Sequence, residues 1–556
     1  MARNNQTNLL LTLLLLTTAY IPHQAYAVES LAVVKTKANQ DAAAQLELGM
    51  SYLEGKGIEK DLKKAFYWVK RSADQGKLTA ITQLGIMYDV GIGVEPDNVK
   101  GRELFIQAAS KGEPYAQINL GKSYELGRGL VQDYSRAFAF YQQAAAQNVP
   151  AAYINLGNLY LDGKGIIKNE QKAFELYKKA ADAGDKEGEF KLGVAYEDGY
   201  GVVKDEHTAF RWYEKSAKHG YDLAQLNLAN FYYFGKGTKK DLKKAFEWYG
   251  KAAEGGIKTA QSNLATMYYK GYGTAKSVSK AISWYLKAAD QGYVPAQLAL
   301  GRYYYLIDKD YSKARLWFEQ AAEQGDAEAQ YNLGVLYNRG EGVGKNQHLA
   351  YSWYLKAAEQ GYAQAQFRIG IWSEVGHGIP VDLEKARILY SRAAEQGLPD
   401  AQYALGELYL QGKGIPKDGK QALIWISKSA QQGFPSAQYQ LGILYLQGQG
   451  VERSEKRAAE WFQKAAERGD LSALYNLGVL YVKGMSVSKD IVKGFAYISV
   501  VALSGDSQAK EAVKALTKEM SSSQIEQANK IEEEYLKSHK GVRNENAQTD
   551  NQNGAI

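Results

Sequence analysis

Few residues in this chain have the types and spacing that catalysis or metal binding requires. The sequence contains six histidines and no cysteine. The five histidines beyond residue 27 follow no H-E-x-x-H or other metal-ligand spacing. We interpret each of them as a surface residue: His207, His219, His348, His377 and His539. Without cysteine the chain has no disulfide, no thiol nucleophile and no thiolate metal site.

Two kinds of glycine motif are superficially similar to nucleotide-binding loops. The Gly-Lys-Ser at 121–123 matches the end of a phosphate-binding loop, but Ala116 replaces the first glycine of that motif and no strand is predicted before it. The many G-x-G pairs, such as Gly55 and Gly57, follow predicted helices, whereas a dinucleotide-binding loop follows a strand. We therefore expect no enzyme activity, no cofactor and no metal ion.

The first 27 residues have the pattern of a secretory signal peptide. Arg3 precedes the apolar run LLLTLLLLTTA at 9–19, and the Ala-Tyr-Ala at 25–27 fits a cleavage site after Ala27. No later stretch approaches the roughly 18 uninterrupted apolar residues of a membrane span. We therefore expect no membrane insertion after cleavage, and a chain without cysteine cannot be a lipoprotein.

Charge and composition fit an exported bacterial protein. Beyond the predicted signal peptide, 67 Lys and Arg stand against 61 Asp and Glu, because Arg3 is the one charged residue removed. This small excess is spread over the whole length, so it gives no indication of nucleic-acid binding. The same part of the chain has no N-x-S/T sequon. We expect a periplasmic or secreted protein.

One short pattern recurs along almost the whole chain. It centres on an anchor leucine or isoleucine that is followed by glycine in eleven copies and by alanine in two. Successive anchors lie 36 residues apart, except for one interval of 33. The thirteen anchors are Leu48, Leu84, Leu120, Leu156, Leu192, Leu228, Leu264, Leu300, Leu333, Ile369, Leu405, Leu441 and Leu477.

Each copy predicts a hairpin of two helices. The pattern A-Q-x-x-L-G-x-x-Y places its recurring residues on one helix face, and a G-x-G ends this first helix. Thirteen residues after the anchor stands Asp, Asn or Ser, which predicts the N-cap of the second helix. The second helix has a pattern like K-A-F-x-W-Y-x-K-A-A and ends at glycine, or at Asn148 in one copy. Stacked hairpins of this kind bury a continuous core between neighbours.

The copy that begins at Leu300 is three residues short. It keeps Tyr304 and Trp317 but lacks the G-x-G, and Asp310 takes the N-cap place ten residues after the anchor. We predict a direct turn through 306–310 and a local change in superhelix pitch, with no domain boundary and no flexible linker.

The full pattern resembles the Sel1-like repeat family, which is related to tetratricopeptide repeats. The resemblance covers residues 44 to about 505, and only the last copy departs from it, with Gly-Met-Ser at 484–486. It implies an all-α, right-handed α-solenoid of about thirteen two-helix repeats. It also implies an adaptor that holds other proteins. One cysteine-rich branch of the family is linked to β-lactam hydrolysis, and this chain departs from that branch.

The ends complete the expected domain organisation. We predict a signal peptide at 1–27, a lead-in at 28–40, the repeat solenoid at 41–505, a C-terminal cap of two helices at 506–540 and a disordered polar tail at 541–556. Ser523 and Glu526 have the spacing of a capping box for the last helix.

Two positions on the first helix vary enough between copies to carry recognition. They are the residue before the anchor and the residue two places after it, which share one face. The resemblance implies that the first position faces a concave groove, and an amide there offers a donor and an acceptor to a peptide backbone. The groove is expected to be polar and partly basic in the first half and more apolar in the second. The candidates are Asn119, Lys122, Asn155, Asn158, Lys191, Asn227, Asn230, Asn263, Arg302, Asn332, Arg368 and Asn476. The alternative is that these asparagines pair within the array.

The favoured hypothesis is an exported scaffold that binds a protein or peptide, acts in envelope signalling or host interaction, and is monomeric. The alternatives are an envelope hydrolase that acts on β-lactam or peptidoglycan, and a glycan-binding solenoid. Glycan binding requires exposed aromatic rings. The repeat register instead predicts buried tryptophans at Trp212, Trp248, Trp284, Trp317, Trp353, Trp425 and Trp461.

Overall fold

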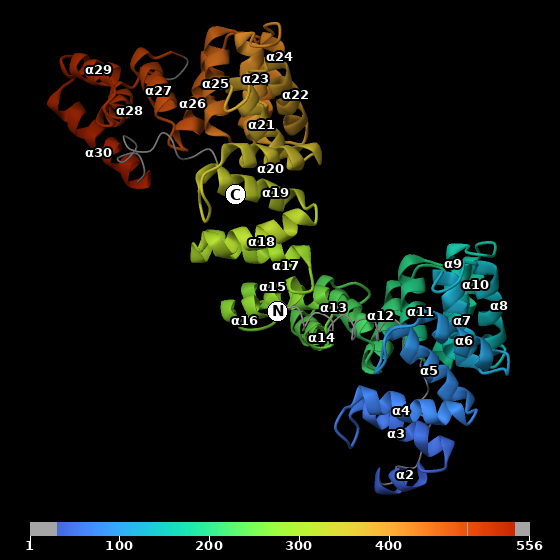
Figure 1. The fold of residues 1–556 in the computed structure, drawn as a ribbon. Helices are drawn as coiled ribbons and strands as arrows, with labels where there is room; N and C mark the ends of the chain where they lie inside the picture. Colours follow the sequence, from blue (N-terminus) through green and yellow to red (C-terminus); the bar gives the residue numbers. More distant parts are fainter. Residues whose placement is uncertain (1–30, 486–487, 540–556) are drawn as a thin grey trace. The chain divides into compact units, whose positions relative to one another are not determined.

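The computed structural model describes residues 31–485 and 488–539, and every regular element in these ranges is a helix. The predicted signal peptide, Ser486 and the predicted tail at 541–556 lie outside the described residues. The chain divides into two compact units, residues 1–288 and 289–556, and each is described by itself (Figure 1). The division lies shortly before the short repeat.

The first unit is a stack of helix hairpins. Over residues 42–270, each first helix packs against the second helix of the preceding repeat, and each complete hairpin packs its two helices together. Its helices are α2 (Leu31–Lys37), α3 (Ala42–Glu54), α4 (Leu62–Asp74), α5 (Leu78–Val90), α6 (Asn98–Ala109), α7 (Pro114–Leu126), α8 (Tyr134–Ala145), α9 (Pro150–Asp162), α10 (Glu170–Asp182), α11 (Lys186–Asp198), α12 (Glu206–Lys218), α13 (Asp222–Phe234), α14 (Leu242–Glu254), α15 (Lys258–Lys270) and α16 (Val278–Ala289).

The second unit repeats this arrangement and adds a helical cap. Its helices are α17 (Val294–Tyr303), the π-helix η1 (Tyr304–Asp308), α18 (Tyr311–Glu323), α19 (Ala327–Arg339), α20 (Gln347–Glu359), α21 (Ala363–Val375), α22 (Leu383–Glu395), α23 (Pro399–Gln411), α24 (Gly419–Gln431), α25 (Pro435–Gln447), α26 (Glu455–Ala466), α27 (Leu471–Lys483), α28 (Ile491–Leu503), α29 (Ser507–Thr517) and α30 (Ser522–Ser538).

The helix boundaries follow the predicted caps. Asp61, for example, accepts a hydrogen bond from the backbone N–H of Lys64 at 3.0 Å, and Asn169 accepts from that of Lys172 at 2.9 Å. Such bonds satisfy amide groups that have no partner inside the helix. The residue that closes each second helix has a positive φ, including Asn148 at 59°. The predicted starts and stops are therefore confirmed.

The Leu-Gly pair allows the two helices of a hairpin to approach closely. A Cβ added to Gly121 would lie 2.6 Å from the ring of Tyr141, and one added to Gly157 would lie 2.6 Å from the ring of Tyr177. Both rings are buried. The glycine therefore provides the space in which an aromatic side chain of the second helix forms the core of the repeat.

The short repeat turns without a glycine loop, as predicted. The first helix continues as η1, and Lys309 then takes a left-handed conformation with φ 58°. Asp310 caps α18 by accepting from the backbone N–H of Lys313 at 3.0 Å. A lysine here makes the reversal that glycine makes in the other repeats.

The C-terminal helices cover the last repeat. Ala528 and Leu536 of α30 join the same buried cluster as Phe495 of α28. A capping box begins α30, but Ser521 and Gln524 form it. The predicted pair, Ser523 and Glu526, was therefore wrong by two residues, because a sequence with three consecutive serines offers more than one register for the cap.

Candidate functional site

The candidate residues lie on the first helices, which approach one another directly between neighbouring repeats. Such close approaches join α5 with α7, α9 with α11, and α25 with α27. We call the side chains one place before and two places after the anchors of the first helices the first-helix surface.

Several candidate asparagines on this surface are bonded to tyrosines of the second helices. The side-chain amide of Asn227 interacts with the hydroxyl of Tyr213 and opposes the rise in its pKa that burial causes, and Asn263 acts in the same way on Tyr249. Asn230 in turn accepts from the hydroxyl of Tyr249 at 2.6 Å. Asn158 accepts in the same way from Tyr177 at 2.8 Å. These asparagines pair within the array, as the alternative hypothesis expected.

Two other asparagines have amide groups without a partner. Asn119 and Asn332 are 7% and 1% exposed, and the side-chain nitrogen of each is buried without a hydrogen bond. Tyr213 stands fourteen residues before Asn227. The residues at the same offset before Asn119 and Asn332 are Phe105 and Phe318. A phenylalanine has no hydroxyl, so it leaves the amide donor unsatisfied. In these two repeats the phenylalanine therefore offers no hydroxyl acceptor to the amide.

The basic candidates of the first unit lie beside an acidic residue. Lys122 on α7 and Lys191 on α11 are half-buried, and both act electrostatically on Glu187 of α11. Burial lowers the pKa of Lys122, and the attraction of Glu187 opposes that effect. Burial likewise raises the pKa of Glu187. Asn155 is half-buried between these helices, on α9.

The three remaining candidates belong to the second unit, and each interacts with another group of the chain. Arg302 is exposed and forms an ion pair with Glu328. Arg368 is half-buried, and its charge acts on the hydroxyl of Tyr390. The amide of Asn476 donates to the backbone carbonyl of Ser472 at 2.9 Å.

A further recurrent group joins the two helices of a repeat through a carboxylate. Tyr213 donates to Glu197 at 2.7 Å, and Lys236 of the next loop lies 3.1 Å from the same carboxylate. Tyr390, Glu374 and Lys413 repeat this arrangement in the second unit, with separations of 2.8 and 2.6 Å. Sequence reasoning missed these groups. The constant offset of Glu and Lys from the anchor could have indicated them.

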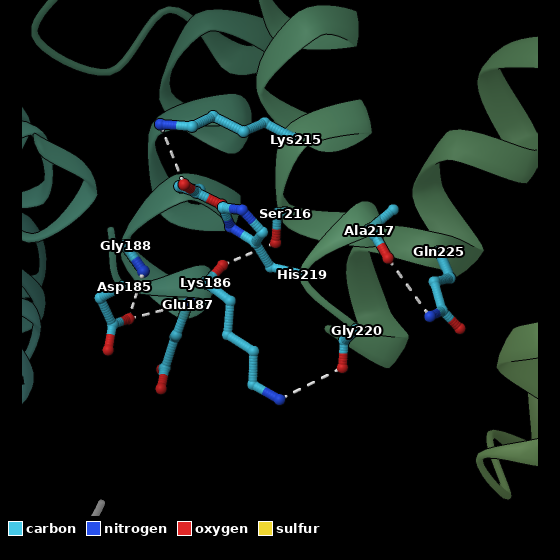
Figure 2. A network of polar contacts seen from close by, with 11 residues as sticks. Asp185, Lys186, Glu187, Gly188, Lys215, Ser216, Ala217, His219, Gly220 and Gln225 are labelled. Atoms are coloured by element: carbon cyan, nitrogen blue, oxygen red, sulfur yellow. Dashed lines mark hydrogen bonds and ion pairs between the residues drawn. The ribbon is translucent and has the colours of Figure 1, made fainter. Parts of the chain in front are cut away.

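One repeat replaces a buried amide pair by charged groups. In several repeats a glutamine three residues before the anchor is bonded to a glutamine at the end of the second helix, as Gln402 is to Gln432 at 2.8 Å. On α11 the corresponding residue is Glu189, which is fully buried. His219 lies 2.8 Å from its carboxylate and Lys215 lies 3.0 Å from it, both reaching from the region of α12 (Figure 2).

Figure 2 shows the first turn of α11 beside this buried carboxylate. Asp185 accepts from the backbone N–H groups of Glu187 and Gly188, each at 2.9 Å, and Ser216 donates to the carbonyl of Lys186 at 2.6 Å. The charged residues are thereby held by the backbone and by one another. We interpret this network as structural.

The histidines of the described residues form no metal-binding cluster. Within residues 31–485 and 488–539 no three His, Asp or Glu residues gather as a metal site. Four of the five histidines are exposed, and His539 is half-buried.

The prediction of buried tryptophans was wrong, because all seven are half-buried. Adjacent helix residues point about 100° apart, so a tryptophan beside the buried tyrosine lies at the flank of the core. In several repeats a lysine covers the ring, as Lys251 does over Trp248 at 3.9 Å.

The comparisons with known proteins agree with this architecture. The family model of the Sel1 repeat matches residues 42–77, 79–113, 114–149, 150–185, 186–221, 222–257, 258–293, 294–326, 327–362, 363–398, 399–434, 435–470 and 471–500. The chain belongs to the Sel1 repeat family. The predicted family and fold class are confirmed, and the repeats form an α-solenoid, the fold typical of protein-interaction scaffolds.

Two solved structures are similar along much of this Sel1 repeat chain. A protective antigen present in uropathogenic Escherichia coli strains is 29% identical, with a TM-score of 0.53, and the match covers 95% of this chain and 100% of that one. A Sel1 repeat protein from Oxalobacter formigenes is 36% identical, with a TM-score of 0.47, and the match covers 55% and 90%. No curated protein gave a match. In the part of this chain that the structure describes, no helix has the length and apolarity needed to cross a membrane.

Proposed function

We propose that this Sel1 repeat protein is an exported scaffold that holds a protein partner through an extended peptide on its first-helix surface. Repeat arrays of this kind present long continuous surfaces without needing a catalytic centre. The proposal includes export through the segment at 1–27 and a role in the bacterial envelope or at the host surface. The protective antigen from Escherichia coli supports it, since an antigen of that kind meets the host.

The observation that carries the proposal is the pair of unsatisfied amides at Asn119 and Asn332. A buried donor without an acceptor is unfavourable unless a partner supplies one. The backbone carbonyl of an extended peptide is such an acceptor. Both side-chain nitrogens are shielded from solvent, so the groups around them must move when a peptide binds.

A paired capture experiment tests the proposal. The bait is the chain from Val28 with a tag at its C-terminus, and it is exposed to envelope extract and to host surface proteins. The test variant combines Asn119→Ala with Asn332→Ala. The control variant combines Asn227→Ala with Asn263→Ala, whose amides interact with Tyr213 and Tyr249 within the array.

We expect one protein to be held by the bait and by the control variant but lost by the test variant, with all three baits folded to the same helical content. Retention by all three would leave a scaffold whose partner binds elsewhere. If no protein is held by any bait, the scaffold proposal fails, and assays for β-lactam, cell-wall and glycan substrates become the next step.

A further inference from the structure

Three neighbouring loops of the first unit expose one large aliphatic side chain each. Val131, Ile167 and Val203 are 88%, 88% and 85% exposed. They occupy the same place in consecutive repeats, eleven residues after the anchors, in the loops before α8, α10 and α12. We call these three side chains the aliphatic row.

The aliphatic row is confined to these three repeats. Single exposed aliphatic residues are common on protein surfaces, but a repeated series at one structural position is not explained by chance exposure. At the same position the other full-length repeats have charged or small residues or proline: Glu59, Glu95, Lys239, Ala275, Gly344, Pro380, Pro416, Glu452 and Ser488.

The three loops lie along one edge of the stack. A Cβ added to Gly165 would lie 2.5 Å from the backbone of Tyr134, which begins the second helix of the preceding repeat. Leu130, Ile166 and Val202, which precede the residues of the row, are half-buried. The loop backbone is therefore fixed on its inner side, and the next side chain points outward.

The three loops of the aliphatic row and the loop that follows them contain more basic than acidic residues, and Asp162, Glu170, Asp198 and Glu206 directly flank two of them. The loops at 127–133, 163–169, 199–205 and 235–241 contain seven Lys or Arg residues and three Asp residues. The three aspartates are N-caps whose carboxylates accept from helix N–H groups. Four of the seven basic residues form ion pairs, namely Arg128, Lys164, Lys168 and Lys236. The other three, Lys204, Lys239 and Lys240, are exposed.

We propose that the aliphatic row is a peripheral docking surface for an anionic phospholipid membrane. Separate aliphatic side chains that enter the headgroup region need no complementary pocket, because a lipid interface is fluid, and flanking lysines are attracted to anionic headgroups. A protein partner would require a matching apolar surface. This proposal is independent of the first-helix surface, since the row lies on loops and not on the faces of the first helices.

Vesicle sedimentation tests the proposal. The probe is a vesicle of phosphatidylcholine with roughly one third phosphatidylglycerol, compared with a vesicle of phosphatidylcholine alone. The test variant combines Val131→Ser, Ile167→Ser and Val203→Ser. The control variant combines Val375→Ser, Val381→Ser and Leu503→Ser, which are also exposed aliphatic residues but lie outside the row. A charge variant combines Lys168→Glu, Lys204→Glu and Lys239→Glu.

We expect the unchanged chain to bind the anionic vesicles and to bind the neutral vesicles at least about tenfold more weakly, with binding that falls as salt is added. The test and charge variants should each lose about tenfold or more in partition, whereas the control variant should bind like the unchanged chain. Absence of binding to anionic vesicles, or equal binding by the test variant, would overturn the proposal. If the test variant instead loses only a captured protein, the row is a protein interface and the lipid proposal is also overturned.

Discussion

The hydroxyl of Tyr213 in α12 donates to Glu197 of α11 at 2.7 Å. The side-chain amide of Asn227, in the first helix of the next repeat, also interacts with this hydroxyl and opposes the rise in its pKa that burial causes. One tyrosine hydroxyl therefore contacts the first helix of its own repeat and the first helix of the next.

Restoring this hydroxyl where it is missing should satisfy a buried amide. We expect Phe105→Tyr to place an acceptor near Asn119 and to stabilise the chain by about 0.5–1.5 kcal/mol, as one added hydrogen bond does. Removing it by Tyr213→Phe should destabilise the chain by about 1–3 kcal/mol, since Asn227 is then left unsatisfied. Urea unfolding followed by circular dichroism measures both.

The Phe105→Tyr variant also tests partner binding. If a peptide carbonyl bonds to Asn119, the tyrosine introduced by Phe105→Tyr competes for that donor and lowers partner affinity while stability rises. A variant that is more stable and binds its partner unchanged would show that the unsatisfied amide of Asn119 has no role in binding.

The glycine after the anchor should tolerate no side chain where an aromatic ring covers it. We expect Gly157→Ala to destabilise the chain by about 1–3 kcal/mol, because its Cβ would overlap the ring of Tyr177. Gly250→Ala is the control, since a Cβ on Gly250 meets no atom within 4 Å, and it should stabilise α14 by about 0.5–1 kcal/mol. Thermal unfolding of the two variants side by side measures the difference. Equal effects would contradict the packing argument.

The sequence alone predicted the fold in detail, but it did not predict which contacts the binding candidates make. Periodicity and capping residues located every hairpin, because helix ends depend on local chemistry such as that of Asp61 and Asn148. The bonds of Asn227 depend instead on a contact between two repeats. That contact could have been suspected from the constant spacing to Tyr213, but only the folded structure shows that the two groups meet. The half-buried tryptophans were missed because periodicity does not distinguish the flank of a core from its centre.

The buried carboxylate of Glu189 and its two exposed partners, Lys215 and His219, should depend on one another. We expect Glu189→Gln combined with His219→Gln to restore the amide pair of the other repeats and to leave stability within about 1 kcal/mol of the unchanged chain. His219→Ala alone should destabilise the chain by about 1–3 kcal/mol, because it removes one partner of a buried carboxylate. A double-mutant cycle measures the coupling, and strictly additive effects would contradict it.

Glu407 should make stability fall as the pH rises. Burial raises the pKa of this carboxyl above its ordinary 4.5, a hydrogen bond from Gln411 opposes the shift, and the like charge of Glu374 adds to it. The folded chain therefore binds the proton of Glu407 more strongly than the unfolded chain does. The stability that this proton contributes is present at low pH and is lost as the pH rises through the folded pKa. We expect Glu407→Gln to raise the unfolding temperature at pH 7 and to change it little below pH 4.5. Gln411→Ala should lower stability at pH 7, because it removes the hydrogen bond that supports the charged form.

Lys309 should be replaceable by glycine with a gain in stability. Its φ of 58° lies in the left-handed region, which disfavours side chains by about 1–2 kcal/mol. Glycine adopts this conformation freely but loses more backbone entropy on folding, so we expect Lys309→Gly to stabilise the chain by about 0.5–1 kcal/mol. Lys345→Gly serves as the control, because Lys345 has no positive φ and the same change there should destabilise. If Lys309→Gly also destabilises, the short repeat is held by interactions of the lysine side chain, and the turn does not need glycine-like freedom.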